Sequence, residues 1–272
     1  MTVKILATDL DGTLIPLPHN AQNHADLKRL HEELPVHGIE PVYVTGRHLE
    51  SVLRAIEEYG LPQPDWIVCD VGTSIYRRQP QGTYEKDSAY RHFLQNRIVA
   101  MSVEALRESL GGFGELQLQE AEKQGEFKLS YYAPSAALHE LVQRLHNHLI
   151  SVDAPFSMVH SVDPFNGRGL IDFLPQGISK AAAVQWWVEA RGVAPEKVVF
   201  AGDSGNDLAA LTAGYRSIVV ANAPATLVEA VRRAHRRAGW EDRLFVADQP
   251  ATSGVRQGCI HFGWIPATTA TE

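Results

Sequence analysis

Cysteine is scarce in this chain, and so are long apolar runs and any excess of basic charge. Cys69 and Cys259 are the only cysteines among 272 residues, and they form neither a metal-binding spacing nor a disulfide framework. No apolar run approaches the ~20 residues needed to cross a bilayer, and we expect no signal peptide. The net charge of −7 disfavours a nucleic-acid-binding surface. These absences favour a cytoplasmic protein that binds neither nucleic acid nor membrane.

The apolar segments predict an α/β fold. Strands and helices alternate near the start of the chain and again after residue 179, which is typical of a parallel sheet with right-handed crossovers. Buried strands are expected over residues 3–8, 40–44, 66–71, 197–201, 217–221 and 244–246. Helices are expected over residues 24–34, 48–59, 180–190, 224–235 and 253–262. We therefore predict a doubly wound parallel sheet formed by residues 1–83 and 169–272.

The residues between these two halves follow another pattern. A long helix is expected over 88–110 and a second over 135–149. Apolar and polar residues alternate over 127–132, which predicts a strand with one covered face in an antiparallel or mixed sheet. Residues 84–168 are therefore expected to form a separate α+β cap domain.

Two carboxylates follow the first predicted strand. The segment Asp9-Leu10-Asp11-Gly12-Thr13 comes directly after it. In open α/β sheets, ligands bind beyond the carboxyl ends of the strands. Two carboxylates placed there repel each other unless a positive charge neutralises them. Mg²⁺ prefers oxygen ligands and is typically held by one or two carboxylates, so the segment indicates a magnesium site.

Three further polar clusters are expected at the same edge. Thr45-Gly46-Arg47 and the segment from Asp203 to Asp207 each follow a predicted strand, and Lys180 opens a predicted helix. These residue types suit phosphoryl transfer to a carboxylate. One aspartate can attack phosphorus, a second can move the proton, and a hydroxyl, an ammonium and Mg²⁺ can bind the phosphate oxygens.

In this order, the four clusters resemble the four motifs of the haloacid dehalogenase (HAD) superfamily, and the inserted residues resemble its type IIB cap. The resemblance spans the whole chain. It implies that Asp9 is the nucleophile and Asp11 the general acid and base. Thr45 and Lys180 would bind the phosphate, with Gly46 beside them.

The same resemblance implies the metal ligands. Mg²⁺ would be held by Asp9, the backbone carbonyl of Asp11, and Asp203. Asp207 would either support the metal or orient Lys180, and the sequence leaves both roles open.

Shorter segments resemble the sucrose-phosphate phosphatases, a family of cap-bearing HAD enzymes. They are Thr45-Gly46-Arg47, Val71-Gly72-Thr73, Phe127-Lys128-Leu129-Ser130-Tyr131 and Asp172-Phe173-Leu174-Pro175. The resemblance implies a phosphoric monoester hydrolase that acts on sucrose 6-phosphate. Ser74 departs from it, because plant and cyanobacterial members usually carry Glu there. Mannosylfructose-phosphate phosphatases also lack that Glu, so they, other sugar-phosphate phosphatases and a phosphomannomutase-like mutase stay open as alternatives.

The remaining candidate residues concern the sugar. Lys128 is on the polar face of its predicted strand, where it either faces the substrate or simply faces water. Asp172 is expected to bond a sugar hydroxyl or a backbone turn, because its neighbours are apolar. Arg47 and Asn206 complete the expected substrate-binding set. A third class of function, a non-catalytic protein that docks on a glycosyltransferase, is disfavoured by the intact catalytic set, although an association with such an enzyme stays open.

Overall fold

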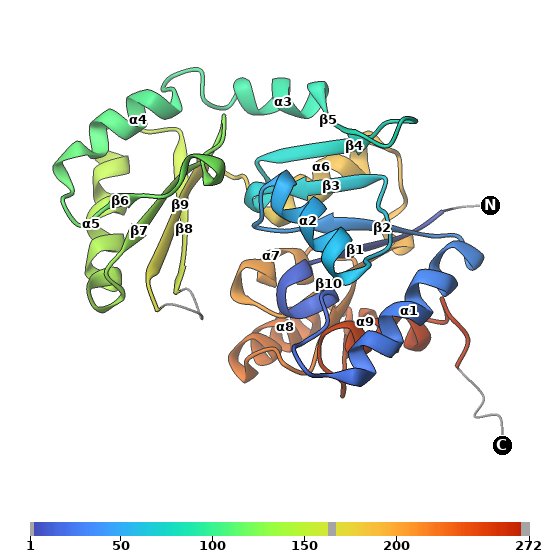
Figure 1. Ribbon diagram of the computed structural model, residues 1–272. Coiled ribbons are helices and arrows are strands. Elements are labelled where there is room, and N and C mark those ends of the chain that lie inside the picture. Colours follow the sequence, from blue (N-terminus) through green and yellow to red (C-terminus); the bar gives the residue numbers. More distant parts are fainter. Residues whose placement is uncertain (1–2, 163–166, 268–272) are drawn as a thin grey trace.

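Two β-sheets organise the protein (Figure 1). The computed structural model describes residues 3–162 and 167–267. In these residues a larger sheet has the strand order β12-β11-β10-β1-β2-β3-β4-β5, and a smaller one has the order β6-β7-β9-β8. The strands are β1 (Lys4–Thr8), β2 (Ile39–Val44), β3 (Trp66–Cys69), β4 (Ser74–Arg78), β5 (Tyr84–Lys86), β6 (Gln117–Leu118), β7 (Leu129–Ala133), β8 (Phe156–Val162), β9 (Gly169–Pro175), β10 (Val198–Gly202), β11 (Arg216–Val219) and β12 (Leu244–Val246).

The larger sheet confirms the predicted doubly wound fold. Neighbouring strands from β12 through β3 are parallel, and only β4 and β5 join it antiparallel. The first strand, β1, pairs with β2 from its own half and with β10 from the second half of the chain. The carboxyl ends of strands from both halves therefore meet at one edge.

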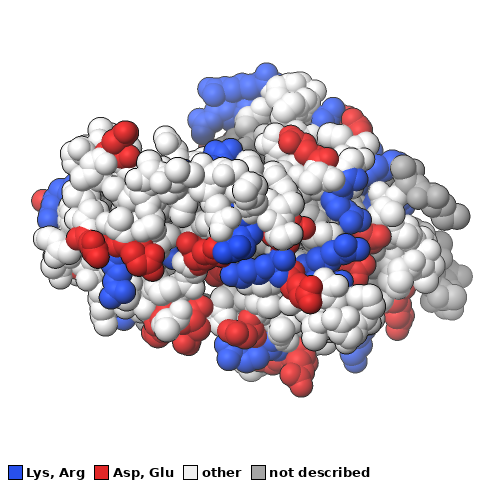
Figure 2. All heavy atoms as spheres, turned by 90° about the horizontal axis from the view of Figure 1, so that it is seen from above, with Lys and Arg blue, Asp and Glu red and all other residues white. Residues whose placement is uncertain are grey.

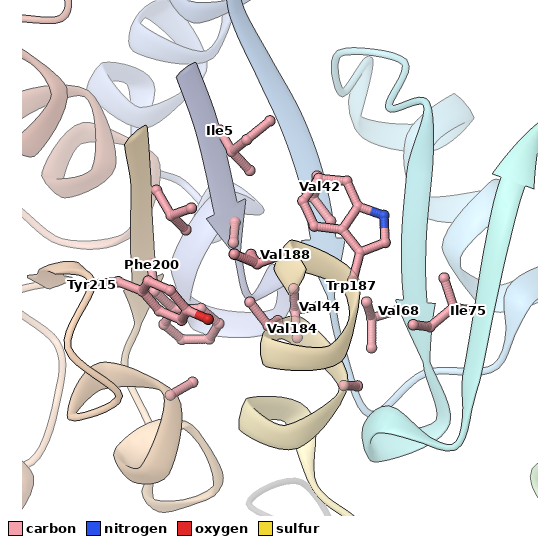
Figure 3. Packing of buried hydrophobic residues seen from close by; sticks show 14 of the residues in the cluster. Ile5, Val42, Val44, Val68, Ile75, Val184, Trp187, Val188, Phe200 and Tyr215 are labelled. Atoms are coloured by element: carbon pink, nitrogen blue, oxygen red, sulfur yellow. The ribbon is translucent and has the colours of Figure 1, made fainter. Parts of the chain in front are cut away.

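Helices cover both faces of this sheet. On one face α1 (Ala21–Val36), α2 (Leu49–Tyr59) and α9 (Ala251–His261) bury their apolar residues. On the other face lie α6 (Lys180–Ala190), α7 (Leu208–Leu211), α8 (Ala225–Ala238) and α3 (Ser88–Gln95). Figure 3 shows Trp187 of α6 reaching the strands beside Val42 and Val68. Burial on both faces explains the nearly continuous apolar character of the central strands.

The smaller sheet has its own core. Its strands pack against α4 (Val103–Ser109) and α5 (Leu138–Ser151), which lie on the side away from the larger sheet in Figure 1. The strand memberships move the predicted boundaries, because β5 belongs to the larger sheet and β9 to the smaller one. We therefore propose that the cap spans residues 103–175, with 96–102 as the crossing that follows α3, in place of 84–168.

The long helix expected over 88–110 is wrong, because it is two helices. One of them, α3, buries Tyr90 and Leu94 in the core of the larger sheet, whereas α4 buries Val103 and Leu106 in the cap core. Between them the chain leaves one core for the other, and the side chain of Ser102 caps α4 by accepting a hydrogen bond from the Ala105 amide at 3.1 Å.

Two surface properties bear on partners. In the described ranges, no helix combines the length and the apolarity that a bilayer crossing needs. On the face drawn in Figure 2, basic side chains lie among acidic ones and most of the surface is uncharged. That face therefore presents no broad basic field of the kind that holds nucleic acid.

Candidate active site

The site begins where β1 ends. The amide of Asp9 continues the pairing with β10 by donating to the carbonyl of Ala201 at 3.0 Å. The chain then turns through residues 10–14, where Gly12 has a φ of +76°. A Cβ on Gly12 would lie 2.5 Å from Oδ2 of Asp203. Glycine is therefore needed both for the backbone angle and for the close approach of the Asp203 carboxylate.

Lys180 ties the two halves of the chain together. It opens α6, whose N-cap Ser179 accepts a hydrogen bond from the Ala182 amide at 3.2 Å. Its ammonium donates to Oδ1 of Asp9 at 2.8 Å, Oδ1 of Asp207 at 2.9 Å and Oδ1 of Asn206 at 3.2 Å. All three protons of the buried ammonium are thus engaged.

Asp207 is occupied on both oxygens. While Oδ1 accepts from Lys180, Oδ2 accepts from the amides of Asp203 and Ser204 at 3.2 and 3.1 Å. This carboxylate closes the turn after β10 as part of a capping box with Ser204. Its contacts are those of a residue that orients Lys180 and the turn.

Carboxylate oxygens of Asp9, Asp203 and Asp207 lie within 4.8 Å of one another. Burial raises the pKa of Asp9 to about 8 even though the Lys180 ammonium opposes the shift, and burial raises the pKa of Asp203 to about 6. When all three carboxylates are ionised, the single Lys180 ammonium leaves two negative charges uncompensated. A divalent cation with oxygen ligands, such as Mg²⁺, fits this donor set and this charge.

Asp203 is held by two residues outside the predicted set. The hydroxyl of Thr13 donates to its Oδ1 at 2.8 Å. The amide group of Asn222 donates to the carbonyl of Gly12 at 2.8 Å and lies 3.5 Å from Oδ2 of Asp203, while its oxygen accepts from the Ala251 amide. Sequence reasoning missed Asn222, although it follows β11 at the same sheet edge.

Asp11 does not join the carboxylate cluster. Arg47 donates to its two oxygens from Nε at 2.7 Å and from Nη2 at 2.6 Å. The Asp11 side chain is 56% exposed, and Nη1 of Arg47 is anchored on Ser51 at the start of α2. The two residues form a partly exposed bidentate ion pair.

Thr45 is buried at the end of β2. Its amide donates to the carbonyl of Val68, and its hydroxyl oxygen accepts from the Arg47 amide at 3.2 Å. The hydroxyl proton can therefore be donated to a ligand. Gly46 follows it, and a Cβ there would contact Val71 at 3.8 Å, so space alone does not require glycine at this position.

Two predicted cap residues alternate with residues of the cap core: Asp172 lies between Ile171 and Phe173 on β9, and Lys128 directly precedes Leu129 of β7. Oδ1 of Asp172 on β9 accepts a hydrogen bond at 2.5 Å from the hydroxyl of Ser130, its partner on β7. Of the two alternatives for Lys128, the one in which it simply faces water is wrong, because the residue is 4% exposed. Its ammonium lies 3.2 Å from Oδ1 of Asp70 in the larger domain.

The chain resembles sugar-phosphate phosphatases over nearly its whole length. A family model for sucrose-6F-phosphate phosphohydrolase matches residues 2–263. A mannosylfructose-phosphate phosphatase of Agrobacterium fabrum is 30% identical, over 97% of this chain and 98% of its own. A HAD-like hydrolase of Nitrosococcus oceani is 36% identical, over 98% of this chain and 73% of its own. Among solved structures, the sucrose-phosphatase of Synechocystis with sucrose and phosphate has a TM-score of 0.75 at 24% identity, covering 98% of this chain and 100% of that one, which establishes the shared fold.

Proposed function

Since the chain belongs to the sucrose-6F-phosphate phosphohydrolase family of HAD hydrolases, it is a sugar-phosphate phosphatase, and we propose that sucrose 6-phosphate is its substrate. The single observation that carries the chemistry is the position of the Asp9 carboxylate. It lies at the end of β1, against Lys180 and within 4.8 Å of the other two carboxylates of the cluster. An oxyanion there can attack phosphorus while neighbouring groups bind the remaining phosphate oxygens.

In the proposed first step, an oxygen of Asp9 attacks phosphorus. The bond between phosphorus and the sugar oxygen breaks, and Asp11 donates a proton to that oxygen. Lys180 and the hydroxyl of Thr45 stabilise charge on the other phosphate oxygens. In the second step Asp11 takes a proton from water, the water oxygen bonds to phosphorus, and the bond between phosphorus and Asp9 breaks. Phosphate leaves and Asp9 is regenerated.

We propose the metal site from two carboxylates of this cluster and one backbone carbonyl. Asp9, Asp203 and the backbone carbonyl of Asp11 would hold Mg²⁺, while Asp207 would orient Lys180 because both of its oxygens are engaged. Bound Mg²⁺ would neutralise phosphate charge and polarise the phosphoryl group.

Arg47 gives Asp11 a resting position outside the cluster. A carboxylate that accepts two charge-assisted hydrogen bonds cannot donate a proton until they are released. We propose that the substrate replaces Asp11 on Arg47, which frees Asp11 to face the leaving oxygen. Arg47 is then a substrate-binding residue, with Gly46, Asn206, Lys128 and Asp172 as the other proposed members.

One alternative substrate has specific support. The Agrobacterium fabrum relative is a mannosylfructose-phosphate phosphatase, and Ser74 stands where plant and cyanobacterial sucrose-phosphate phosphatases usually carry Glu. Mannosylfructose phosphate is therefore the second candidate. A phosphomannomutase-like activity and an association with a glycosyltransferase have no comparable support.

Phosphate release from a panel of esters tests the proposal. The panel holds sucrose 6-phosphate, mannosylfructose phosphate, glucose 6-phosphate and p-nitrophenyl phosphate. We expect the highest kcat/KM on one of the two disaccharide phosphates, no turnover in excess EDTA, and recovery with Mg²⁺. Full activity after metal stripping would refute the metal assignment, and a preference for the monosaccharide phosphate would refute the substrate class.

A further inference from the structure

The turn after β3 has an unusual backbone. Asp70, Val71 and Gly72 have φ angles of +55°, +58° and +97°. For a β-branched residue such as Val71, a positive φ is a genuine outlier. In residues other than glycine, such angles persist only where the surrounding contacts enforce them. Contacts with neighbouring segments must therefore hold this turn in its conformation.

The turn is held from three sides. The amide of Asp70 donates to the carbonyl of Arg47 at 3.0 Å, and the amide of Val71 donates to the carbonyl of Thr45 at 3.1 Å. Gly72 lies against the start of α6, since a Cβ there would be 2.3 Å from the carbonyl oxygen of Ser179. The turn therefore contacts both the proposed phosphate-binding segment, Thr45-Gly46-Arg47, and the start of α6, which begins with Lys180.

The carboxylate of Asp70 connects this turn to the cap. Its Oδ1 lies 3.2 Å from Nζ of Lys128, and the two side chains are 8% and 5% exposed. This oxygen has no well-aligned hydrogen bond among the described residues. The ion pair thus fixes the position of the ammonium without fully committing its protons, which leaves donors for a ligand.

We propose that Asp70 is a specificity-determining positioning residue, which holds the ammonium of Lys128 beside the phosphate-binding segment so that Lys128 binds hydroxyl oxygens of a polyhydroxylated leaving alcohol. The inference rests on the proposed function and deepens it. The strained turn fixes the carboxylate with respect to Thr45 and Arg47, and the carboxylate fixes the cap lysine with respect to both. A small ester without hydroxyls on its leaving group cannot use this contact.

A purely structural ion pair would behave differently. Breaking a buried pair by removing one partner destabilises a protein, because a charge is left buried without compensation. A structural role predicts that all substrates lose activity together as the fold weakens. The positioning role predicts a change in the ratio between substrates, carried mainly by KM.

The test compares four variants with wild type: Asp70→Asn, Lys128→Met, the double variant, and Asp26→Asn as a matched control. Asp26 is as buried as Asp70 and also ion-paired, with Arg29 at 3.2 Å and Arg256 at 3.8 Å, but it lies on α1, far from the cap (Figure 1). For each protein we would measure kcat and KM on the preferred sugar phosphate and on p-nitrophenyl phosphate, and the melting temperature.

The quantity to compare is kcat/KM on the sugar phosphate divided by kcat/KM on p-nitrophenyl phosphate. We expect Asp70→Asn and Lys128→Met each to lower this ratio by about 10-fold or more. The double variant should lower this ratio no further than the more impaired of the two single variants does, because the two residues act as a unit. It also leaves no buried charge unpaired, so it keeps the test valid if a single variant fails to fold. Asp26→Asn should lower the melting temperature and leave the ratio unchanged.

An unchanged ratio in the folded pair variants, or equal losses on both substrates, would overturn the inference while the wild-type preference still supports the proposed function. A wild type that releases no phosphate from any sugar phosphate would instead overturn the proposed function, and this inference with it.

Discussion

At the scale of single residues, the site is held together by side chains that each make hydrogen bonds to more than one group. The Lys180 ammonium bonds Asp9 and Asp207, and Asn222 spans the Gly12 carbonyl and the Ala251 amide. Removing such a residue leaves at least one buried group without its partner, and the cost of an unsatisfied group exceeds the net gain from the bond itself.

Asp11→Asn tests the proton transfer. Asparagine keeps the backbone carbonyl proposed for the metal site but cannot donate an acidic proton. We expect kcat on the preferred sugar phosphate to fall by about 10²-fold or more, the usual scale of general acid–base catalysis, with little change in the Mg²⁺ concentration that gives half-maximal activity. A variant with near-wild-type kcat would remove Asp11 from the mechanism.

Asn222→Ala tests the support of Asp203. Losing a residue that orients a metal ligand typically weakens metal affinity about 10–100-fold, and the same range is expected for Mg²⁺ here. The midpoint of a Mg²⁺ titration followed by thermal shift measures this without catalysis. Asn147→Ala, on the exposed side of α5, is the control that should leave the midpoint unchanged. A wild-type midpoint in Asn222→Ala would show that Thr13 alone suffices.

The sequence predicted the acidic and basic members of the candidate site, but most of their side-chain pairings were not predicted. Asp9, Lys180 and Asp203 follow or open elements whose ends must converge in a parallel sheet, so their meeting was predictable. That Asp11 pairs with Arg47, and that Asp70 reaches Lys128, depends on side-chain directions and on how the cap sits on the core. No local pattern encodes these contacts.

At the scale of elements, the start of a helix can be predicted from the sequence where a capping residue precedes apolar residues at helical spacing. The helix predicted over residues 180–190 begins directly after Ser179, which is the N-cap of α6 in the structure. The short strands β4 and β5 were missed because Arg77 and Arg78 make that segment polar, as the outer strands of a sheet often are. The crossing from α3 to α4 was missed because the helical period continues across two separate cores.

Ser179→Ala tests how far a cap positions a catalytic residue. Losing an N-cap costs about 0.5–2 kcal/mol of stability, which urea denaturation would measure. We also expect kcat to fall, because Lys180 is the first residue of the helix that Ser179 caps. Ser102→Ala removes the N-cap of α4 in the cap and should lower stability similarly with kcat preserved. Equal kcat in both variants would show that the other contacts of Lys180 hold it without the cap.

At the scale of the whole molecule, the carboxylate cluster opposes folding when no cation is bound. Burial raises the pKa of Asp203 from its usual value of 3.8 to about 6, so the folded state binds more protons than the unfolded state between these values. Stability is therefore lost as pH rises through this interval. Mg²⁺ binds the deprotonated carboxylates and should stabilise the protein more at high pH than at low pH.

Asp203→Asn isolates this effect, because asparagine does not titrate. In EDTA, the melting temperature of the variant relative to wild type should increase by a few degrees between pH 5 and pH 8. In saturating Mg²⁺ the order should reverse at pH 8, with wild type the more stable protein. A constant difference across pH in EDTA would contradict the raised pKa of Asp203.

The pairing of β1 with β10 also sets the order of events during synthesis. Asp9 leaves the ribosome directly after β1. One of the two neighbours of β1 in the sheet, β10, is complete only when Gly202 has been synthesised. At ~5–20 residues per second, about 10–40 s separate the two. Throughout that time one edge of β1 has no native partner and an exposed strand edge invites foreign pairing. A nascent chain stalled before residue 198 would therefore be both inactive and a client for chaperones.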